Sequence, residues 1–181
     1  MVDENPWYSQ LREIWRPRQV QLLLIAESAP DDHGDSSQRR FFYADHLGSA
    51  DNLFRSVVGA MYGATKDDLR QTGKRPWLTR LQADGFYVID LAPYPVNAAS
   101  SQAARSRILR ENVPGCIERA RALNPDEVVV VKSNLYPMLS APLRAAGLLV
   151  PQNAGIPFPL GNKRAEFVSA FNAARRGTGT S

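Results

Sequence analysis

Short, almost unbroken apolar runs alternate along the chain with longer stretches in which apolar residues recur at helical spacing. Three runs, at residues 20–26, 86–91 and 127–131, are typical of strands covered on both faces, and a weaker fourth lies at 148–150. The helical stretches are 6–15, 49–62, 76–83, 101–123 with a break at Pro114, and 133–146, with Gly147 placed to terminate the last. This alternation predicts an α/β fold, a three-layer α/β/α sandwich around a central four-stranded, mainly parallel sheet.

Length and composition favour one folded unit. The chain has 181 residues, of which 44% are hydrophobic and 22% charged, and this balance is typical of a globular protein with a sizeable core. We expect a single domain over residues 1–176, followed by a flexible C-terminal tail at 177–181 that is rich in Gly and Thr.

The positive charge is unevenly distributed. The net charge is +4, but residues 1–90 carry 11 basic and 13 acidic side chains, whereas residues 91–181 carry 11 basic and 5 acidic ones. Such asymmetry suits a face that meets polyanions. Because 18 of the 22 cations are Arg and the chain is rich in Ala, a general bias in composition explains the asymmetry equally well.

Several classes of protein are excluded by the reactive residues. Cys116 is the single cysteine, so the chain cannot be stapled by internal disulfides or hold a cluster that needs four thiolates. His33 and His46 are the two histidines, which makes a structural zinc site improbable. The N-terminus is acidic and lacks an apolar segment. We therefore expect a cytoplasmic monomer with no membrane segment, no metal and no cofactor.

Polar residues follow each predicted strand. In open parallel sheets, ligands bind outside the carboxyl ends of the strands. The residues that this rule selects are Glu27, Ser28, Asp31 and Asp32 after the first run, Asp90, Tyr94 and Asn97 after the second, Lys132 and Ser133 after the third, and Gln152 and Asn153 after the fourth.

Two loops combine aromatic and cationic residues. The block Arg39-Arg40-Phe41-Phe42-Tyr43 has the guanidinium groups and rings that grip phosphate and stack bases, although each ring suits core packing as well. The loop 156–164 holds Phe158 between two prolines and leads into a terminal helix that Asn162 is placed to cap. It also carries Lys163 and Arg164, so it fits a wedge or anion-binding loop, or a packed connection.

Short motifs in the sequence can be compared with what two kinds of hydrolase require. The triplet Gly34-Asp35-Ser36 is similar to the nucleophile block of one lipase-like class, but no histidine after His46 can serve as the base. Glu27, Asp31 and Asp32 could hold Mg²⁺ in a phosphoester hydrolase. Alternatively, Asp31 and Asp32 form a turn after Pro30.

Taken in order, these segments resemble the motifs of the uracil-DNA glycosylase superfamily. One branch has a first motif Gly-Glu-Ala-Pro-Gly directly after the first strand, where this chain has Ala26-Glu27-Ser28-Ala29-Pro30. A Pro-Phe-Val block follows, whose ring stacks on the flipped base, and Phe41-Phe42-Tyr43 stands in its place. The resemblance therefore implies that Phe42 is the stacking residue and that Ser28 lies beside the base.

Later motifs extend the resemblance from Val20 to Phe171. The family's next strand carries an Asn that reads the base, followed by a Pro-rich turn with a second Asn, and residues 86–97 put Asp90 and Asn97 at these two places. The family's terminal His-Pro-Ser loop enters the DNA minor groove, and residues 156–160 occupy its place. Its histidine is absent here, as are the cysteines of the iron-sulphur branch.

Asp90 in place of the base-reading Asn changes the chemistry of recognition. An Asn both donates and accepts hydrogen bonds, whereas an ionised carboxylate only accepts them and repels the carbonyl oxygens of uracil. It suits a base edge that carries an amino group, as Asp and Glu accept from cytosine N4. A protonated Asp90 could still donate, which would need a pKa raised by burial.

The leading hypothesis is a divergent glycosylase-like protein that binds a flipped or free nucleobase and excises a damaged base from DNA by hydrolysis of the N-glycosidic bond. Glu27 would orient or deprotonate the attacking water, and the residues that would contact DNA are Arg39, Arg40, Phe158, Lys163 and Arg164. The alternatives are a binding protein of the same fold without catalysis and the Mg²⁺-dependent phosphoester hydrolase.

Overall fold

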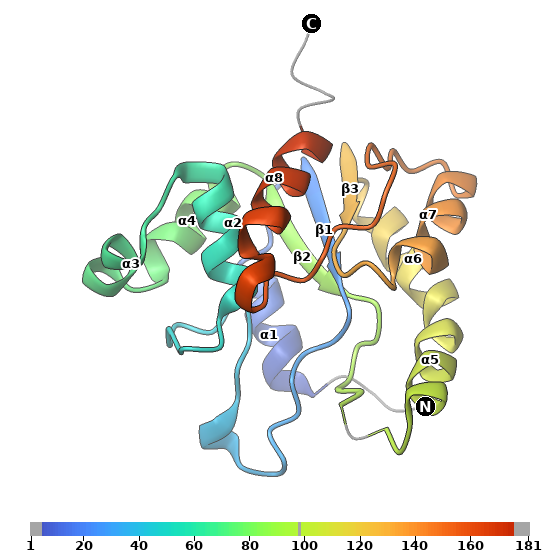
Figure 1. Ribbon diagram of the computed structural model, residues 1–181, viewed down its shortest axis with the longest axis horizontal. Coiled ribbons are helices and arrows are strands. Elements are labelled where there is room, and N and C mark those ends of the chain that lie inside the picture. The colour runs from blue at the N-terminus through green and yellow to red at the C-terminus, as the bar shows by residue number, and fades with distance from the viewer. Residues whose placement is uncertain (1–4, 98, 176–181) are drawn as a thin grey trace, which may run out of the picture.

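A parallel sheet of three strands forms the centre of the protein (Figure 1). The computed structural model describes residues 5–97 and 99–175. Within them the strands are β1 (Leu22–Ala26), β2 (Phe86–Asp90) and β3 (Glu127–Val130), in the spatial order β2-β1-β3. The register places Ala26 beside Asp90 and Ile25 beside Val130, so all three strands end at the same edge.

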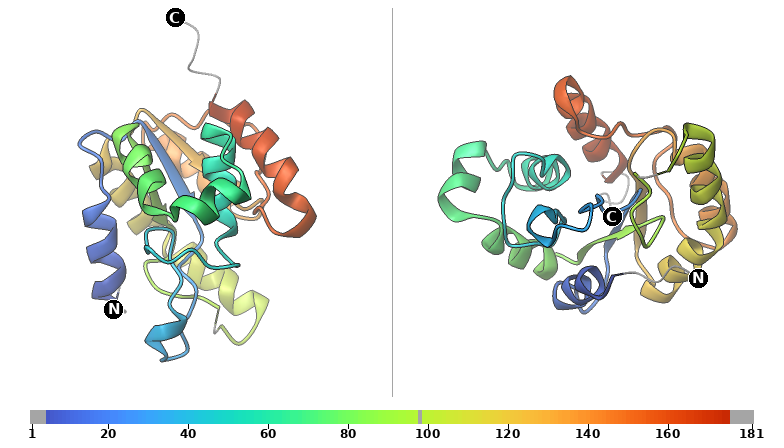
Figure 2. Two further views of the ribbon diagram at one scale, coloured as in Figure 1. Left: turned by 90° about the vertical axis from the view of Figure 1, so that its left-hand side faces the viewer. Right: turned by 90° about the horizontal axis from the view of Figure 1, so that it is seen from below.

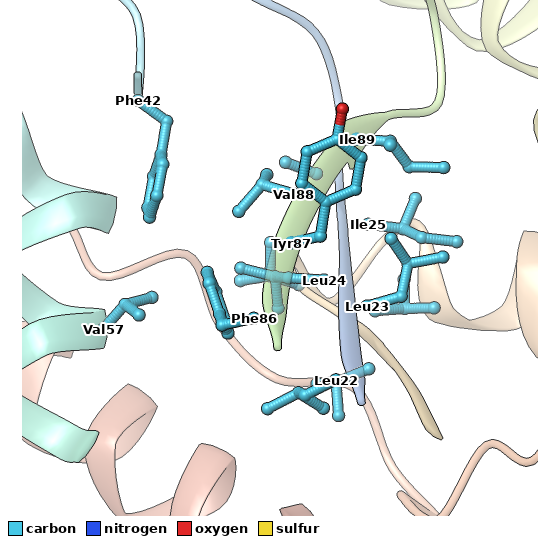
Figure 3. Packing of buried hydrophobic residues seen from close by; sticks show 14 of the residues in the cluster. Leu22, Leu23, Leu24, Ile25, Phe42, Val57, Phe86, Tyr87, Val88 and Ile89 are labelled. Carbon is cyan, nitrogen blue, oxygen red and sulfur yellow. The ribbon is translucent and has the colours of Figure 1, made fainter. Parts of the chain in front are cut away.

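Burial on both faces explains why the strands are continuous apolar runs. Every residue of the three strands is buried, including Glu127 at the start of β3. Figure 3 shows Phe86 and Val88 pointing toward the side from which Phe42 and Val57 approach, while Ile25 and Ile89 point to the other side. Because both sides are apolar, helices must cover both.

Eight α-helices occur in the described residues, and they lie on both sides of the sheet (Figure 2). Seen from below, α2 and α8 lie on one side, and α1 and α6 lie on the other. The α/β class is therefore confirmed. The helices are α1 (Pro6–Ile14), α2 (Asn52–Tyr62), α3 (Lys66–Thr72), α4 (Arg75–Ala83), α5 (Gln102–Glu111), α6 (Val113–Leu123), α7 (Tyr136–Ala145) and α8 (Arg164–Arg175).

Local signals set several helix ends. Pro114 lies in the first turn of α6, where its missing N–H costs no hydrogen bond, and this separates α6 from α5. Gly147 follows α7 at a φ of 84°, and its N–H donates to the carbonyl of Arg144 (2.9 Å). The short α3, which the apolar pattern does not predict, begins with a capping box between Thr65 and Asp68.

The predicted fourth strand is wrong. Residues 148–150 run beside β3, and the Leu149 carbonyl accepts from the Val128 N–H (2.8 Å), but they form no strand. The next residue is Pro151, which has no N–H, and the side chain of Gln152 bonds both backbone groups of Val130 instead (2.5 and 3.0 Å). An isolated bridge between Val131 and Ile156 completes this irregular edge.

Two other expectations concern the C-terminal region. Asn162 does not cap the terminal helix, because Gly161–Lys163 forms a 3₁₀ turn that runs directly into α8. The predicted tail at 177–181 lies outside the described residues. Within the part of the chain that the structure describes, no helix combines the length and apolar character needed to cross a bilayer.

Candidate functional site

A pocket of about 580 Å³ opens where the three strands end. This is the lower edge of the sheet in Figure 1, the place where ligands bind in open parallel sheets. The volume lies within the range of about 300–1,000 Å³ that is usual for small-molecule sites. The strand ends and the loops that follow them contribute Ala26, Glu27, Ser28, Ala29, Pro30, Val88, Asp90, Asn97 and Lys132 to its lining, and more distant segments contribute Arg40, Phe41, Phe42, Ala50, Asp51, Leu53, Phe54, Arg105, Phe158 and Leu160.

Phe42 is both a core residue and part of the pocket wall. Its side chain is buried, and its ring packs edge-on against Phe54 (centroids 5.3 Å apart) and tilted against Phe86 (5.9 Å). The core-packing interpretation of the aromatic block therefore holds for Phe42, and its place in the lining leaves base stacking as a prediction. A ring held by such neighbours presents a rigid apolar surface to a ligand.

A buried lysine holds the loop that carries Phe42. The Lys74 side chain is fully buried, donates to the Phe41 carbonyl (2.9 Å) and pairs with Asp51 (3.2 Å). Its ammonium also lies 4.7 Å from the centre of the Phe54 ring. Burial lowers the pKa of Lys74, and Asp51 opposes that effect. The aromatic wall is thus anchored through an ion pair behind it.

Glu27 lies at the inner end of the pocket between two cations. Arg105, from α5, donates through Nε to Oε1 (2.7 Å) and pairs with the same oxygen through Nη2, while Lys132 donates to Oε2. The Glu27 side chain is 7% exposed, against 28% for Arg105 and 32% for Lys132. The carboxylate is therefore buried behind cations that reach the pocket.

Lys132 has an unusual backbone conformation. Its φ is 82°, in the left-handed region that residues other than glycine rarely adopt. The conformation is held by its N–H, which donates to the Ile156 carbonyl (2.8 Å), and by its own carbonyl, which accepts from the Leu135 N–H (2.9 Å). Such positions cost on the order of 1–3 kcal/mol and gather at ligand sites.

Asp90 is fixed by an arginine from the N-terminal helix. The two side chains are 7% and 10% exposed, and Arg12 Nη2 lies 2.5 Å from Asp90 Oδ2. Burial raises the pKa of Asp90, while the positive charges of Arg12 and Arg119 oppose the rise. Asp90 therefore lines the pocket as one half of a buried ion pair.

The residues proposed for DNA contact separate into two groups. Arg40 and Phe158 line the pocket, together with Leu160, which is 61% exposed. Arg39, Lys163 and Arg164 do not line it.

Each of the outlying residues has a different setting. Arg39 pairs with Asp32 (2.7 Å) and lines a second cavity of about 440 Å³ that also includes Trp7. Lys163 pairs with Glu166 (2.7 Å) on the surface, and Arg164 begins α8. Lys163 and Arg164 lie outside the lining because the 3₁₀ turn at Gly161–Lys163 leads the chain from the lining residue Leu160 into α8.

The acidic residues after β1 do not form a metal site. Asp31 accepts from the His33 N–H (3.0 Å), and Asp32 accepts from the Gly34 N–H (2.9 Å), so both form a turn. Among the residues described, no three or more His, Cys, Asp or Glu side chains gather where they could hold a metal ion. The three-carboxylate set that the Mg²⁺-dependent hydrolase needs is therefore not assembled around Glu27.

Three contacts of the site could not be read from the sequence pattern. The strand-end rule points to Glu27, Asp90 and Lys132, but Arg12 and Arg105 each lie 78 residues from the carboxylate they bind. The signal for Arg105 was its place in the basic second half of the chain. Lys74 carries no sequence signal that separates it from a surface lysine.

Comparisons with protein-family models, with curated proteins and with solved structures find no significant match for this chain.

Proposed function

We propose that the pocket binds a nucleobase, either extruded from DNA or free, and that the chain is a divergent uracil-DNA glycosylase-like protein that hydrolyses the N-glycosidic bond. The observation that carries the proposal is the convergence of Glu27, Phe42 and Asp90 in one pocket. These residues come from three segments whose order along the chain resembles the motifs of that superfamily. A base is flat and polar at its edge, so a ring wall and a carboxylate at the end of the pocket suit it.

Asp90 indicates which base edge the pocket prefers. Oδ2 accepts a hydrogen bond from Arg12, so the carboxylate is held by a permanent cation. In this state it accepts from an exocyclic amino group and repels a carbonyl oxygen. We therefore expect a base with an amino group at the recognised edge to be preferred over uracil.

Glu27 is the residue we assign to the reaction. Bond cleavage at a sugar develops positive charge on the ring, which a nearby carboxylate stabilises, and the same carboxylate can orient a water for attack. Both oxygens of Glu27 accept hydrogen bonds from cations, and Oε2, which accepts from Lys132, has a second lone pair with which it can orient a reacting water.

The mouth of the pocket suits an extruded nucleotide. Phe158 and Leu160 lie at the lining, and the exposed Leu160 side chain is the kind of apolar group that fills the gap left in a base stack. Arg40, also exposed and at the lining, can contact phosphate.

The test is incubation of the protein with labelled oligonucleotides that carry a panel of altered bases, followed by cleavage at abasic sites. We expect excision of an amino-bearing base, with uracil excised more slowly. Glu27→Gln should abolish excision without unfolding the protein, while the matched control Glu111→Gln, an exposed residue of α5, should leave it unchanged. Retained excision by Glu27→Gln would remove Glu27 from the mechanism, and uracil excised as fast as any other base would overturn the assignment of Asp90.

A second candidate is a binding protein of the same fold without catalysis, for a nucleotide or nucleic acid. The double pairing of Glu27 favours it, because a carboxylate held by two cations is also a structural arrangement. In that case the oligonucleotides bind at low salt, and no base of the panel is released. If neither excision nor binding occurs at low salt, both candidates fail.

A further inference from the structure

The charges at the inner end of the pocket do not balance. The two carboxylates there, Glu27 and Asp90, are paired with three cations, which are Arg105 and Lys132 on the first and Arg12 on the second. The third carboxylate of the lining, Asp51, is paired with Lys74. A neutral base does not offset this positive excess, whereas an anionic ligand does.

The positions of the charges show where an anion would enter. The Arg105 and Lys132 side chains are 28% and 32% exposed, against 7% for the Glu27 side chain between them, so a ligand reaches the cations before the carboxylate. In contrast, Arg12 and Asp90 are buried together. The inner end therefore has two accessible cations from α5 and from the residue after β3.

The donor groups match phosphate. Arg105 uses Nε and Nη2 on a single oxygen of Glu27, and the same pair of N–H groups can take two oxygens of a phosphate. Lys132 adds a point charge from a strained backbone position that is fixed by two backbone hydrogen bonds. Strain at a residue that points a cation into a pocket is typical of a ligand-binding position.

We propose that Arg105 and Lys132 form a phosphate subsite, and that a phosphate group of the ligand displaces Glu27 from these two cations. This inference rests on the proposed nucleobase pocket. The ligand class is then a phosphorylated nucleoside rather than a free base. Displacement leaves a Glu27 oxygen without its cation, available to a water or to the ligand. Glu27 thus stays paired with Arg105 and Lys132 until a phosphate-bearing ligand binds.

Substitution of a cation and substitution of Glu27 should change the affinity for phosphate in opposite directions. Removing a cation weakens phosphate binding, whereas removing the negative charge of Glu27 strengthens it, because the carboxylate competes with phosphate for the same donors. A merely structural ion-pair cluster would not bind phosphate in either variant.

The experiment is titration calorimetry of the full chain with inorganic phosphate, a nucleoside, the corresponding nucleoside 5′-monophosphate and a short single-stranded oligonucleotide. We expect the monophosphate to bind about tenfold or more tightly than the nucleoside, as one charge-assisted contact allows. Arg105→Gln and Lys132→Gln should each remove most of that difference. Glu27→Gln should tighten phosphate binding, and the control Arg107→Gln, exposed on the same helix, should change nothing.

The phosphate sources are separated by the ligands themselves. Tighter binding of the monophosphate than of the oligonucleotide identifies a terminal phosphate, and the reverse identifies a phosphodiester. Arg105→Lys keeps the positive charge and serves where Arg105→Gln unfolds, with partial loss of phosphate affinity expected because the fork is lost.

Two results would overturn the subsite: equal affinity for nucleoside and monophosphate, or phosphate affinity that Glu27→Gln leaves unchanged. Failure of the proposed function can be distinguished from failure of the subsite. If inorganic phosphate binds but no base-bearing ligand binds more tightly, the subsite stands and the nucleobase pocket does not. If nucleosides bind and phosphate adds nothing, the pocket stands and the subsite does not.

Discussion

Two buried carboxylates at neighbouring strand ends are paired in different ways. The side chains of Asp90 and Glu27 are equally exposed, at 7%. The partner of Asp90 is a nearly buried arginine, whereas Glu27 is paired with two cations that are about a third exposed. A buried charge depends on its partner, whereas an accessible cation can exchange its partner for a ligand. We therefore expect the first pair to be a structural element, and we propose the second as the reactive one.

The largest effect expected from this comparison follows loss of the buried partner. Arg12→Met leaves the buried Asp90 carboxylate without its ion-pair partner and should lower the free energy of unfolding by about 3–5 kcal/mol. Urea denaturation of the variant beside the wild-type protein measures this. A loss below about 1 kcal/mol, the value typical of exposed pairs, would show that the pair is not structural.

A third buried pair should behave like the first. Lys74→Met removes the partner of Asp51 and the donor to the Phe41 carbonyl, and should cost about 3 kcal/mol. This lies at the lower end of the range because Asp51 still accepts from the Gly48 N–H (2.6 Å). Urea denaturation measures the loss. Binding of a nucleoside should weaken in the folded variant, since the loop that carries Phe42 loses its anchor, and unchanged binding would contradict that role.

The buried pair of Arg12 and Asp90 should also make stability depend on pH. Burial raises the pKa of Asp90 in the folded state, so its contribution to stability is present below its unfolded pKa and is lost as pH rises through the folded one. Arg12 opposes the rise, so Arg12→Met should extend the loss to higher pH. The free energy of unfolding of this variant should therefore fall further below wild type between about pH 4 and pH 7.

Urea denaturation at a series of pH values tests this, with Arg12→Met/Asp90→Asn as the control. The double variant has no carboxylate to ionise at this position, so its difference from wild type should no longer grow with pH. If the free energies of unfolding of wild type and Arg12→Met run parallel with pH, Arg12 does not influence the ionisation of Asp90, and the prediction is wrong.

The smallest effect should come from the exposed partner of Glu27. Arg105→Gln leaves Lys132 to neutralise the carboxylate, so the free energy of unfolding should change by less than about 1 kcal/mol. Thermal unfolding beside the surface control Arg107→Gln measures the difference. A loss as large as that of Arg12→Met would mean that the two carboxylates are held alike, and the distinction between them would be lost.

Strands can be predicted from the sequence where they depend on a local apolar pattern, and not where they depend on a contact with a distant residue. The apolar runs of β1, β2 and β3 are local patterns, and each strand lies within its predicted range. The fourth strand is wrong because a side chain, that of Gln152, took the hydrogen bonds of β3 that a strand backbone would have taken. No local pattern reveals that exchange, because it depends on Val130, which is 22 residues away.

Prediction of the candidate site from the sequence is limited in the same way. A parallel sheet brings its strand ends together whatever covers them, so the order of the apolar runs is enough to place Glu27, Asp90 and Lys132 at one edge. Which cation pairs with which carboxylate is set by the packing of the helices. That choice depends on how α1 and α5 pack around the sheet, and it separates a buried pair from an accessible one, because desolvation of each charge is set by every element that surrounds it.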